Sequence, residues 1–486
     1  MLFSQFYISL RQLQLIMKRF FIISICLTML SLASEARPAK GTVTCEGKGL
    51  NKVIVTDGES FTTTKAGGKF RFEINDTAKF VYIITPSGYV ADWSKGSPEF
   101  YKAAKDTDNF TFELIKTDNT DKEYNIIAVG DPQPKKDSHF EEFIGKPLDD
   151  ICRTVSDLSA PTIGIVLGDI CYDKFHLQKR WKEEIVRTGI PFYPVIGNHD
   201  HDKKIDNDTE SSHSYIKYFG PENYAFFIGK DLVIVLDNII YRNHNKYKEG
   251  YTDEIISWVS KLLKLAPKKC DIIMAQHSSL NGRWHRSWNI EPSTVNCDKM
   301  IELLKNHNVN FLSGHNHVHG NFEYSENMYE HNVAAICGTW WDTYHCTDGT
   351  PRGYKVLNKK DGNLTWYYKS IDKDPDFQYE VYMPGEAPMN PEHLVLNVWD
   401  YDSKWKIEWF EDGQYRGPME QVYEKSPIHT SELKAKYEPT GTEPKVYRLT
   451  QKAIHYFAAK PSANAKEITV VITNRFGKTW KETIKL

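Results

Sequence analysis

The chain has 486 residues, of which 40% are hydrophobic and 26% are charged, the profile of a soluble globular protein with about three domains. The formal net charge is −3 at pH 7, so the composition gives no strong field toward nucleic acid or an anionic membrane, and no nucleic-acid-binding patch is evident. Aromatic residues make up 13% of the chain, which suits β-rich domains.

The N-terminus is predicted to be a targeting segment. Lys18 and Arg19 precede an apolar run at residues 20–33, and small residues at 34–36 suit cleavage. The run is short of the roughly 20 residues that span a bilayer, so we expect a cleaved signal peptide over 1–36 rather than an uncleaved anchor. Met17 is a candidate for the true start. The mature chain is then expected to be periplasmic or secreted and to have no transmembrane segment.

Seven cysteines remain once the signal peptide is removed, and an odd, scattered set does not predict a disulfide framework. Cys337 and Cys346 could close a loop, or they could be plain buried thiols. The spacings do not fit a zinc ribbon.

Residues 37–118 predict a small all-β module, because short alternating stretches are bounded there by Gly, Asn, Asp and Pro. This stretch resembles the β-sandwich modules, similar to carboxypeptidase regulatory domains, that precede secreted catalytic domains. The polar run at 116–123 is the expected linker to the next domain.

Strands and helices alternate in the central domain, which we place at residues 119–340. The predicted strands cover 124–131, 162–169, 191–200, 231–238, 270–277 and 309–317, and the predicted helices cover 140–158 with a break near Pro147, 175–189, 252–266 and 295–307. Thr252 is the expected N-cap of the third helix. This alternation indicates a layered α/β domain. Residues 341–486 return to strand patterns, at 362–370, 393–402, 405–413 and 467–486, and predict a β-rich C-terminal domain.

Polar side chains that can bind a metal lie at the C-terminal ends of five of the predicted strands. They are Asp131, Asp169, Asn198 with His199 and Asp200, His277, and His315 with His317. Ligands bind at the carboxyl ends of strands in open α/β sheets, so these groups can converge. Asp, Asn and His together suit manganese, iron, zinc or nickel better than calcium.

The order Asp-x-x, Gly-Asp-x-x, Gly-Asn-His-Asp, a strand-terminal His, then Gly-His-x-His resembles the calcineurin-like metallophosphoesterases over residues 124–317. The resemblance implies an α/β fold: a central four-layer α/β/β/α sandwich flanked by an N-terminal and a C-terminal all-β domain. It also implies a centre of two divalent or mixed-valence metal ions (Mn, Fe, Zn or Ni).

The same resemblance assigns roles to the residues. Asp169 bridges both metals, Asp131 and His317 bind the first, and Asn198, His277 and His315 bind the second. His199 either protonates the leaving oxygen or stabilises charge on the transferred phosphoryl group, and Asp200 holds its ring.

Two positions depart from the family pattern. Gln133 stands where the family usually has His, and a carboxamide oxygen is a weaker candidate ligand. Tyr172 stands where Asp or Asn is usual; it is either a metal ligand, as in purple acid phosphatases, or a packing residue. Candidate substrate-binding residues are Arg283 and Arg286, suited to phosphate by their fork geometry, and Trp340 and Trp341.

The predicted function is metal-dependent hydrolysis of a phosphate mono- or diester outside the cytoplasm. One alternative is a catalytically lapsed secreted protein that binds glycans or surfaces. Another is a protein Ser/Thr phosphatase, which fits less well because the second motif lacks the Asp-Arg-Gly extension of that subgroup.

Overall fold

The computed structural model describes residues 36–117, 120–243, 246–282 and 292–486. The predicted signal segment, apart from its last residue, and two of the candidate substrate residues, Arg283 and Arg286, lie outside these ranges. Within them, no helix combines the length and the apolar character needed to cross a membrane.

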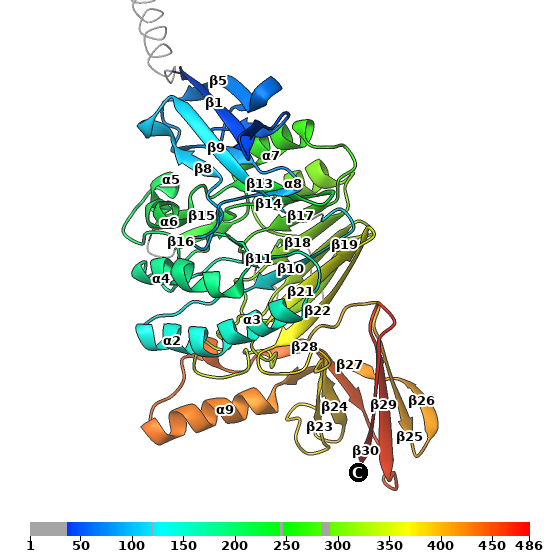
Figure 1. Cartoon of the computed structure of the whole chain (residues 1–486). Coiled ribbons are helices and arrows are strands. Elements are labelled where there is room, and N and C mark those ends of the chain that lie inside the picture. Colours follow the sequence, from blue (N-terminus) through cyan, green and yellow to red (C-terminus); the bar gives the residue numbers. More distant parts are fainter. Residues whose placement is uncertain (1–35, 118–119, 244–245, 283–291) are drawn as a thin grey trace, which may run out of the picture.

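The N-terminal residues form two β-sheets at one end of the molecule (Figure 1). One sheet contains β1 (Ala36–Cys45), β2 (Lys48–Gly49), β5 (Lys69–Asn75), β7 (Tyr89–Ala91) and β9 (Asn109–Lys116), and the other contains β3 (Ile54–Thr56), β4 (Phe61–Thr63), β6 (Phe80–Ile84) and β8 (Tyr101–Ala103). Strand β9 alternates buried and exposed residues, as a strand with one face on a core does.

The first central sheet has the order β12 (Phe192–Pro194), β11 (Thr162–Val166), β10 (Glu123–Val129), β21 (Gly353–Lys360) and β22 (Asn363–Ser370). Strands β10, β11 and β12 are parallel, whereas β21 pairs antiparallel with β10. Helices α2 (Asp137–Gly145), α3 (Pro147–Asp157) and α4 (His176–Glu184) lie along this sheet (Figure 1). The expected break falls at Lys146, because a proline cannot continue a helix begun before it.

This sheet crosses the boundary that we expected at residue 340. Strands β21 and β22 both lie past that residue, yet β21 pairs with β10 along six residue pairs and β22 pairs with β21. The physical reason is that β10 has a second edge, and pairing with β21 satisfies backbone groups that an open edge would leave exposed.

The second central sheet has the order β13 (Tyr224–Ile228), β14 (Asp231–Val235), β17 (Ile272–Ala275), β18 (Val309–Ser313), β20 (Met328–Asn332) and β19 (Gly320–Ser325). Every residue of β14 and β17 is buried, as expected of strands covered on both faces. Helices α7 (Asp253–Leu265) and α8 (Cys297–Leu304) lie beside this sheet (Figure 1). Thr252 caps α7 as predicted, because its side chain accepts a hydrogen bond from the Ile255 amide. The predicted mixed α/β fold, with a central core and two flanking domains, is confirmed.

The remaining described elements of the central part are short. They are helices α5 (Asp208–Ser211) and α6 (His213–Phe219), the 3₁₀ helix η3 (Ile185–Thr188) and the hairpin of β15 (Ile239–Asn243) and β16 (Lys246–Glu249).

The C-terminal residues form two four-stranded sheets at the other end of the molecule (Figure 1). Their strands are β23 (Glu380–Tyr382), β24 (Leu394–Asn397), β28 (Lys452–Ala459) and β27 (Glu420–Lys425), then β26 (Gln414–Pro418), β25 (Lys406–Glu411), β29 (Glu467–Thr473) and β30 (Thr479–Lys485). Apolar side chains from both sheets share one buried cluster. Helix α9 (Pro427–Tyr437) and the 3₁₀ helix η5 (Val446–Arg448) connect β27 to β28.

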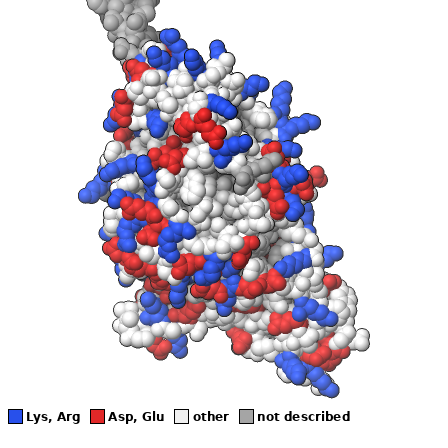
Figure 2. Space-filling model, viewed as in Figure 1, with Lys and Arg blue, Asp and Glu red and all other residues white. Residues whose placement is uncertain are grey.

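Acidic and basic side chains are interspersed over the surface shown in Figure 2. This mixture agrees with the small net charge of the sequence.

Candidate active site

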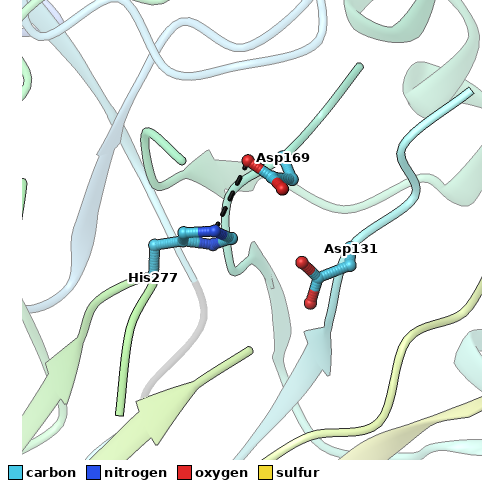
Figure 3. Close-up of side chains that lie close together, drawn as sticks. All are labelled: Asp131, Asp169 and His277. Atoms are coloured by element: carbon cyan, nitrogen blue, oxygen red, sulfur yellow. Dashed lines mark ion pairs between the residues drawn. The ribbon is translucent and has the colours of Figure 1, made fainter. Parts of the chain in front are cut away.

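The predicted ligands meet where the two central sheets end. Asp131 follows β10, Asp169 follows β11, Asn198 follows β12, His277 follows β17, and His315 and His317 follow β18. Figure 3 shows Asp131, Asp169 and His277 pointing toward one another from separate strands, and one ligand atom from each lies within 4.8 Å of the others. Parallel strands of one sheet end at the same edge, so sequence-distant residues arrive together.

Glycines allow this close approach of the loops. A Cβ at Gly197 would lie 2.4 Å from Oδ1 of Asp169, and a Cβ at Gly314 would lie 2.5 Å from Oδ2 of Asp131. Either side chain would therefore displace a candidate ligand.

Three side chains bring possible ligand atoms close together on one side of Asp169. Nδ1 of His277 donates to the Leu167 carbonyl at 2.7 Å, and Nε2 of His315 donates to Oε1 of Glu249 at 3.0 Å. The other nitrogens, His277 Nε2 and His315 Nδ1, lie 3.1 Å apart, and Asn198 Oδ1 lies 3.1 Å from the first of them. Two imidazole nitrogens and an amide oxygen that converge in this way form the donor set of a metal site.

A second set of donors surrounds Asp131. Its Oδ1 lies 3.5 Å from Nε2 of His317, and it is buried without a hydrogen-bond partner among the described residues. Gln133 donates from its amide nitrogen to Oδ2 of Asp169 at 2.5 Å. The buried Oε1 of Gln133 has no hydrogen-bond partner among the residues that the structure describes. Buried oxygens without partners are costly unless something binds them, so these residues fit a metal ion.

Asp169 lies between the two sets. Its Oδ1 is 3.4 Å from His277 Nε2, and its Oδ2 faces Gln133. One carboxylate that reaches both sets is the arrangement that two neighbouring metal ions require.

The pKa shifts of the site residues agree with a site for two metal ions. Burial lowers the pKa of His277 to about 4 and that of His317 to about 3, so both imidazoles are neutral near pH 7. Burial alone would raise the pKa of Asp169, but His277 and His199 outweigh it, and the pKa is lowered. Burial and the Asp169 charge raise the pKa of Asp131 well above its usual range. Two buried carboxylates this close need positive charge beside them.

His199 is oriented by a residue that the sequence did not assign. Its Nδ1 lies 3.2 Å from Oδ1 of Asp173, and its ring stacks on Tyr172 with centroids 4.0 Å apart and planes at 25°. The expectation that Asp200 holds this ring is wrong. Asp173 itself forms an ion pair with Lys203.

Asp200 instead binds the backbone of two loops. Its Oδ2 accepts from the amides of Gly197 at 3.0 Å and Ile170 at 3.1 Å, and its Oδ1 accepts from Nε2 of Gln178 at 3.1 Å. Consecutive residues of the turn after β12 point to opposite sides, so Asp200 fixes the loops while His199 faces the site.

The two tryptophans have different positions. Trp340 stacks on His317 with centroids 4.5 Å apart, which places it at the site. Trp341 is buried and donates from Nε1 to the Pro132 carbonyl at 3.0 Å, so its role is packing. Tyr172, through its stack on His199, also has a packing contact.

The structure adds residues that sequence reasoning missed. Glu249, on β16, holds the His315 ring from 66 positions away, and no motif marks it. Asp173 lies in the stretch GDICYD after β11, and its short distance from Asp169 in the sequence was the signal that could have identified it. Lys135 lies over Tyr172 at 3.9 Å from the ring centroid; burial and the Arg448 charge lower the pKa of Lys135 to about 8.

Left-handed backbone conformations gather at the site. Of the 14 non-glycine residues with positive φ in the described ranges, eight lie in these loops: Asp131, Gln133, Asp169, Asp173, His315, His317, Trp340 and Trp341. Such conformations are strained, and strain of this kind concentrates at functional sites.

Three family models match consecutive parts of the chain. Residues 37–117 match the N terminal of calcineurin-like phosphoesterase, residues 124–319 match calcineurin-like phosphoesterase, and residues 330–480 match the C terminal of calcineurin-like phosphoesterase. The central match spans all the predicted metal ligands.

Solved structures show a partial likeness. A dimetal phosphatase from Danio rerio is 12% identical over 51% of this chain and 97% of its own, with a TM-score of 0.38. A purple acid phosphatase from yellow lupin (Lupinus luteus) seeds is 12% identical over 69% of this chain and 71% of its own, with a TM-score of 0.38. A 5'-nucleotidase from Candida albicans is 13% identical over 52% of each chain, with a TM-score of 0.34. No curated protein matches the chain significantly.

Proposed function

We infer that this chain, which belongs to the calcineurin-like phosphoesterases and is a phosphoric ester hydrolase, cleaves a phosphate mono- or diester outside the cytoplasm. The observation that carries the proposal is the convergence of ligand atoms on both sides of Asp169, beside His199 with its Asp173 partner. The family implies two metal ions, and the residues present fit them.

Each residue has a distinct task in this proposal. Asp131, Gln133 and His317 would hold one metal ion, Asn198, His277 and His315 the other, and Asp169 both. When bound, the two ions supply the positive charge that stabilises the attacking and leaving oxygens of a displacement at phosphorus.

His199 carries the proton transfer. It gives a proton to the oxygen of the departing alcohol, and the Asp173 carboxylate stabilises the charged ring before that transfer. The stack on Tyr172 keeps the ring plane fixed, so the proton is delivered in one direction. This pairing supports an acid role for His199 rather than a structural one.

Export rests on the N-terminal pattern of two basic residues, an apolar run and small residues. A reporter enzyme that works only outside the cytoplasm, fused after residue 36, should be active. The same fusion without residues 1–36 should be silent, and equal activity of both fusions would refute export.

Turnover is tested with 4-nitrophenyl phosphate and bis(4-nitrophenyl) phosphate after loading with Mn, Fe, Zn or Ni. His199→Ala should keep its metal content and lose about 10²- to 10⁴-fold in kcat. Asp169→Asn should lose metal instead. A metal-replete wild type that is silent on both esters would favour the glycan- or surface-binding alternative.

A further inference from the structure

A short C-terminal segment presents apolar side chains to solvent. Val446, Tyr447 and Leu449, in and beside η5, have exposed fractions of 83%, 44% and 43%. Single exposed apolar residues are ordinary, but neighbouring ones indicate contact with an apolar group. What this segment can contact depends on where it lies.

The segment is fixed beside the metal ligands. The Tyr447 ring meets Trp340 edge-on with centroids 5.1 Å apart, and Trp340 in turn stacks on His317. Arg448 forms an ion pair with Asp342 and donates from Nη1 to the Tyr437 hydroxyl at 3.0 Å. Tyr447 is therefore held two ring contacts from the metal centre, and part of its ring stays exposed.

A second aromatic side chain, Tyr172, lies at the same site. Its ring has three partners, the His199 imidazole and the ammonium groups of Lys135 and Lys203. Tyr172 is half-buried, whereas Tyr447 is 44% exposed, so Tyr447 offers the larger surface to a ligand.

We propose that Tyr447, positioned by Trp340 and Arg448, forms a leaving-group subsite that prefers phosphate esters of planar, aromatic alcohols to esters of small aliphatic ones. The proposal rests on the proposed function, because the metal centre must hold the phosphate group. An aromatic leaving group can pack against Tyr447 as Trp340 does, and such ring pairs bind more strongly than their buried area alone predicts.

The test compares phenylphosphonate with methylphosphonate, which share the charged group and differ in the ring. Calorimetry on the metal-loaded wild type should show tighter binding of phenylphosphonate. Tyr447→Ala should reduce this preference by about three- to tenfold and leave the methylphosphonate Kd unchanged, whereas Tyr447→Phe should keep the preference. An unchanged preference in Tyr447→Ala, or an equal loss for both phosphonates, would overturn the proposal.

The matched control is Tyr415→Ala, which removes a tyrosine that is 57% exposed on β26 and donates its hydroxyl hydrogen to Glu408. This variant should behave as wild type, and all variants should have the wild-type metal content. Hexylphosphonate distinguishes an aromatic from a merely apolar subsite. If Tyr447→Ala loses as much affinity for hexylphosphonate as for phenylphosphonate, the aromatic assignment is overturned. If wild type binds phenylphosphonate with the expected dependence on Tyr447 but cleaves no ester, the proposed function fails and the subsite stands.

Discussion

Nδ1 of His199 lies 3.2 Å from Oδ1 of Asp173. Asp200, which follows His199 in the sequence, binds the backbone of two loops with its carboxylate. One short motif thus provides a proton-transfer group and a structural clamp on opposite sides of a turn. The two carboxylates have different tasks, and substitution should separate them.

Asp173→Asn should lower kcat by about 10- to 100-fold with little effect on metal content, because the neutral amide stabilises a charged His199 ring less well. The checks are steady-state kinetics with an aryl phosphate and elemental analysis. Asp206→Asn, at an exposed position of the same chain region, is the control and should retain activity. Wild-type kcat in Asp173→Asn would remove Asp173 from the mechanism.

Asp200→Ala should act on stability. It leaves the buried amides of Gly197 and Ile170 without an acceptor, so we expect a loss of about 2–4 kcal/mol in the free energy of unfolding. Urea denaturation followed by fluorescence measures this change. If the variant unfolds at the wild-type urea midpoint, Asp200 does not clamp the loops.

Gly314→Ala should weaken metal binding by about 10- to 100-fold, because the added methyl group would press on Oδ2 of Asp131 at 2.5 Å. Competition with a chelator measures the affinity. Gly145→Ala is the matched control, since a Cβ there meets nothing within 4 Å. Equal affinities for the two variants would contradict the close approach of these loops.

The contact between the central loops and the C-terminal domain should depend on pH through His345. Nδ1 of this buried ring lies 2.8 Å from Oε1 of Glu432 on α9, and Nε2 lies 3.2 Å from Oε1 of Glu380 on β23. Burial alone would lower the pKa of His345, but the two carboxylates outweigh it and raise the pKa to about 9.

A pKa near 9 in the folded chain, against about 6.5 unfolded, means that the charged ring stabilises the fold. This contribution, up to about 3 kcal/mol, is fully present below pH 6.5 and is lost as the pH rises through 9. The difference in urea midpoint between wild type and His345→Gln should therefore be largest near pH 6 and shrink by pH 9.5. A difference that stays constant over this range would show that His345 is not charged in the fold.

The sequence by itself determined the ligand set and its order. Alternating strands and helices predict parallel strands, and parallel strands bring their carboxyl ends to one edge, so Asp131, Asp169, Asn198, His277 and His315 could be placed together before any contact was known. Local chemistry also determined the helix break before Pro147 and the cap at Thr252.

Only the tertiary structure decided which groups complete the site. Glu249 reaches His315 across 66 positions, Tyr447 reaches Trp340 from another domain, and Asp173 rather than Asp200 faces His199. The physical reason is that strand periodicity fixes which face a residue occupies only while the strand lasts. Beyond its end, loop conformation and packing between distant segments set the direction of each side chain, and those contacts leave no regular spacing in the sequence.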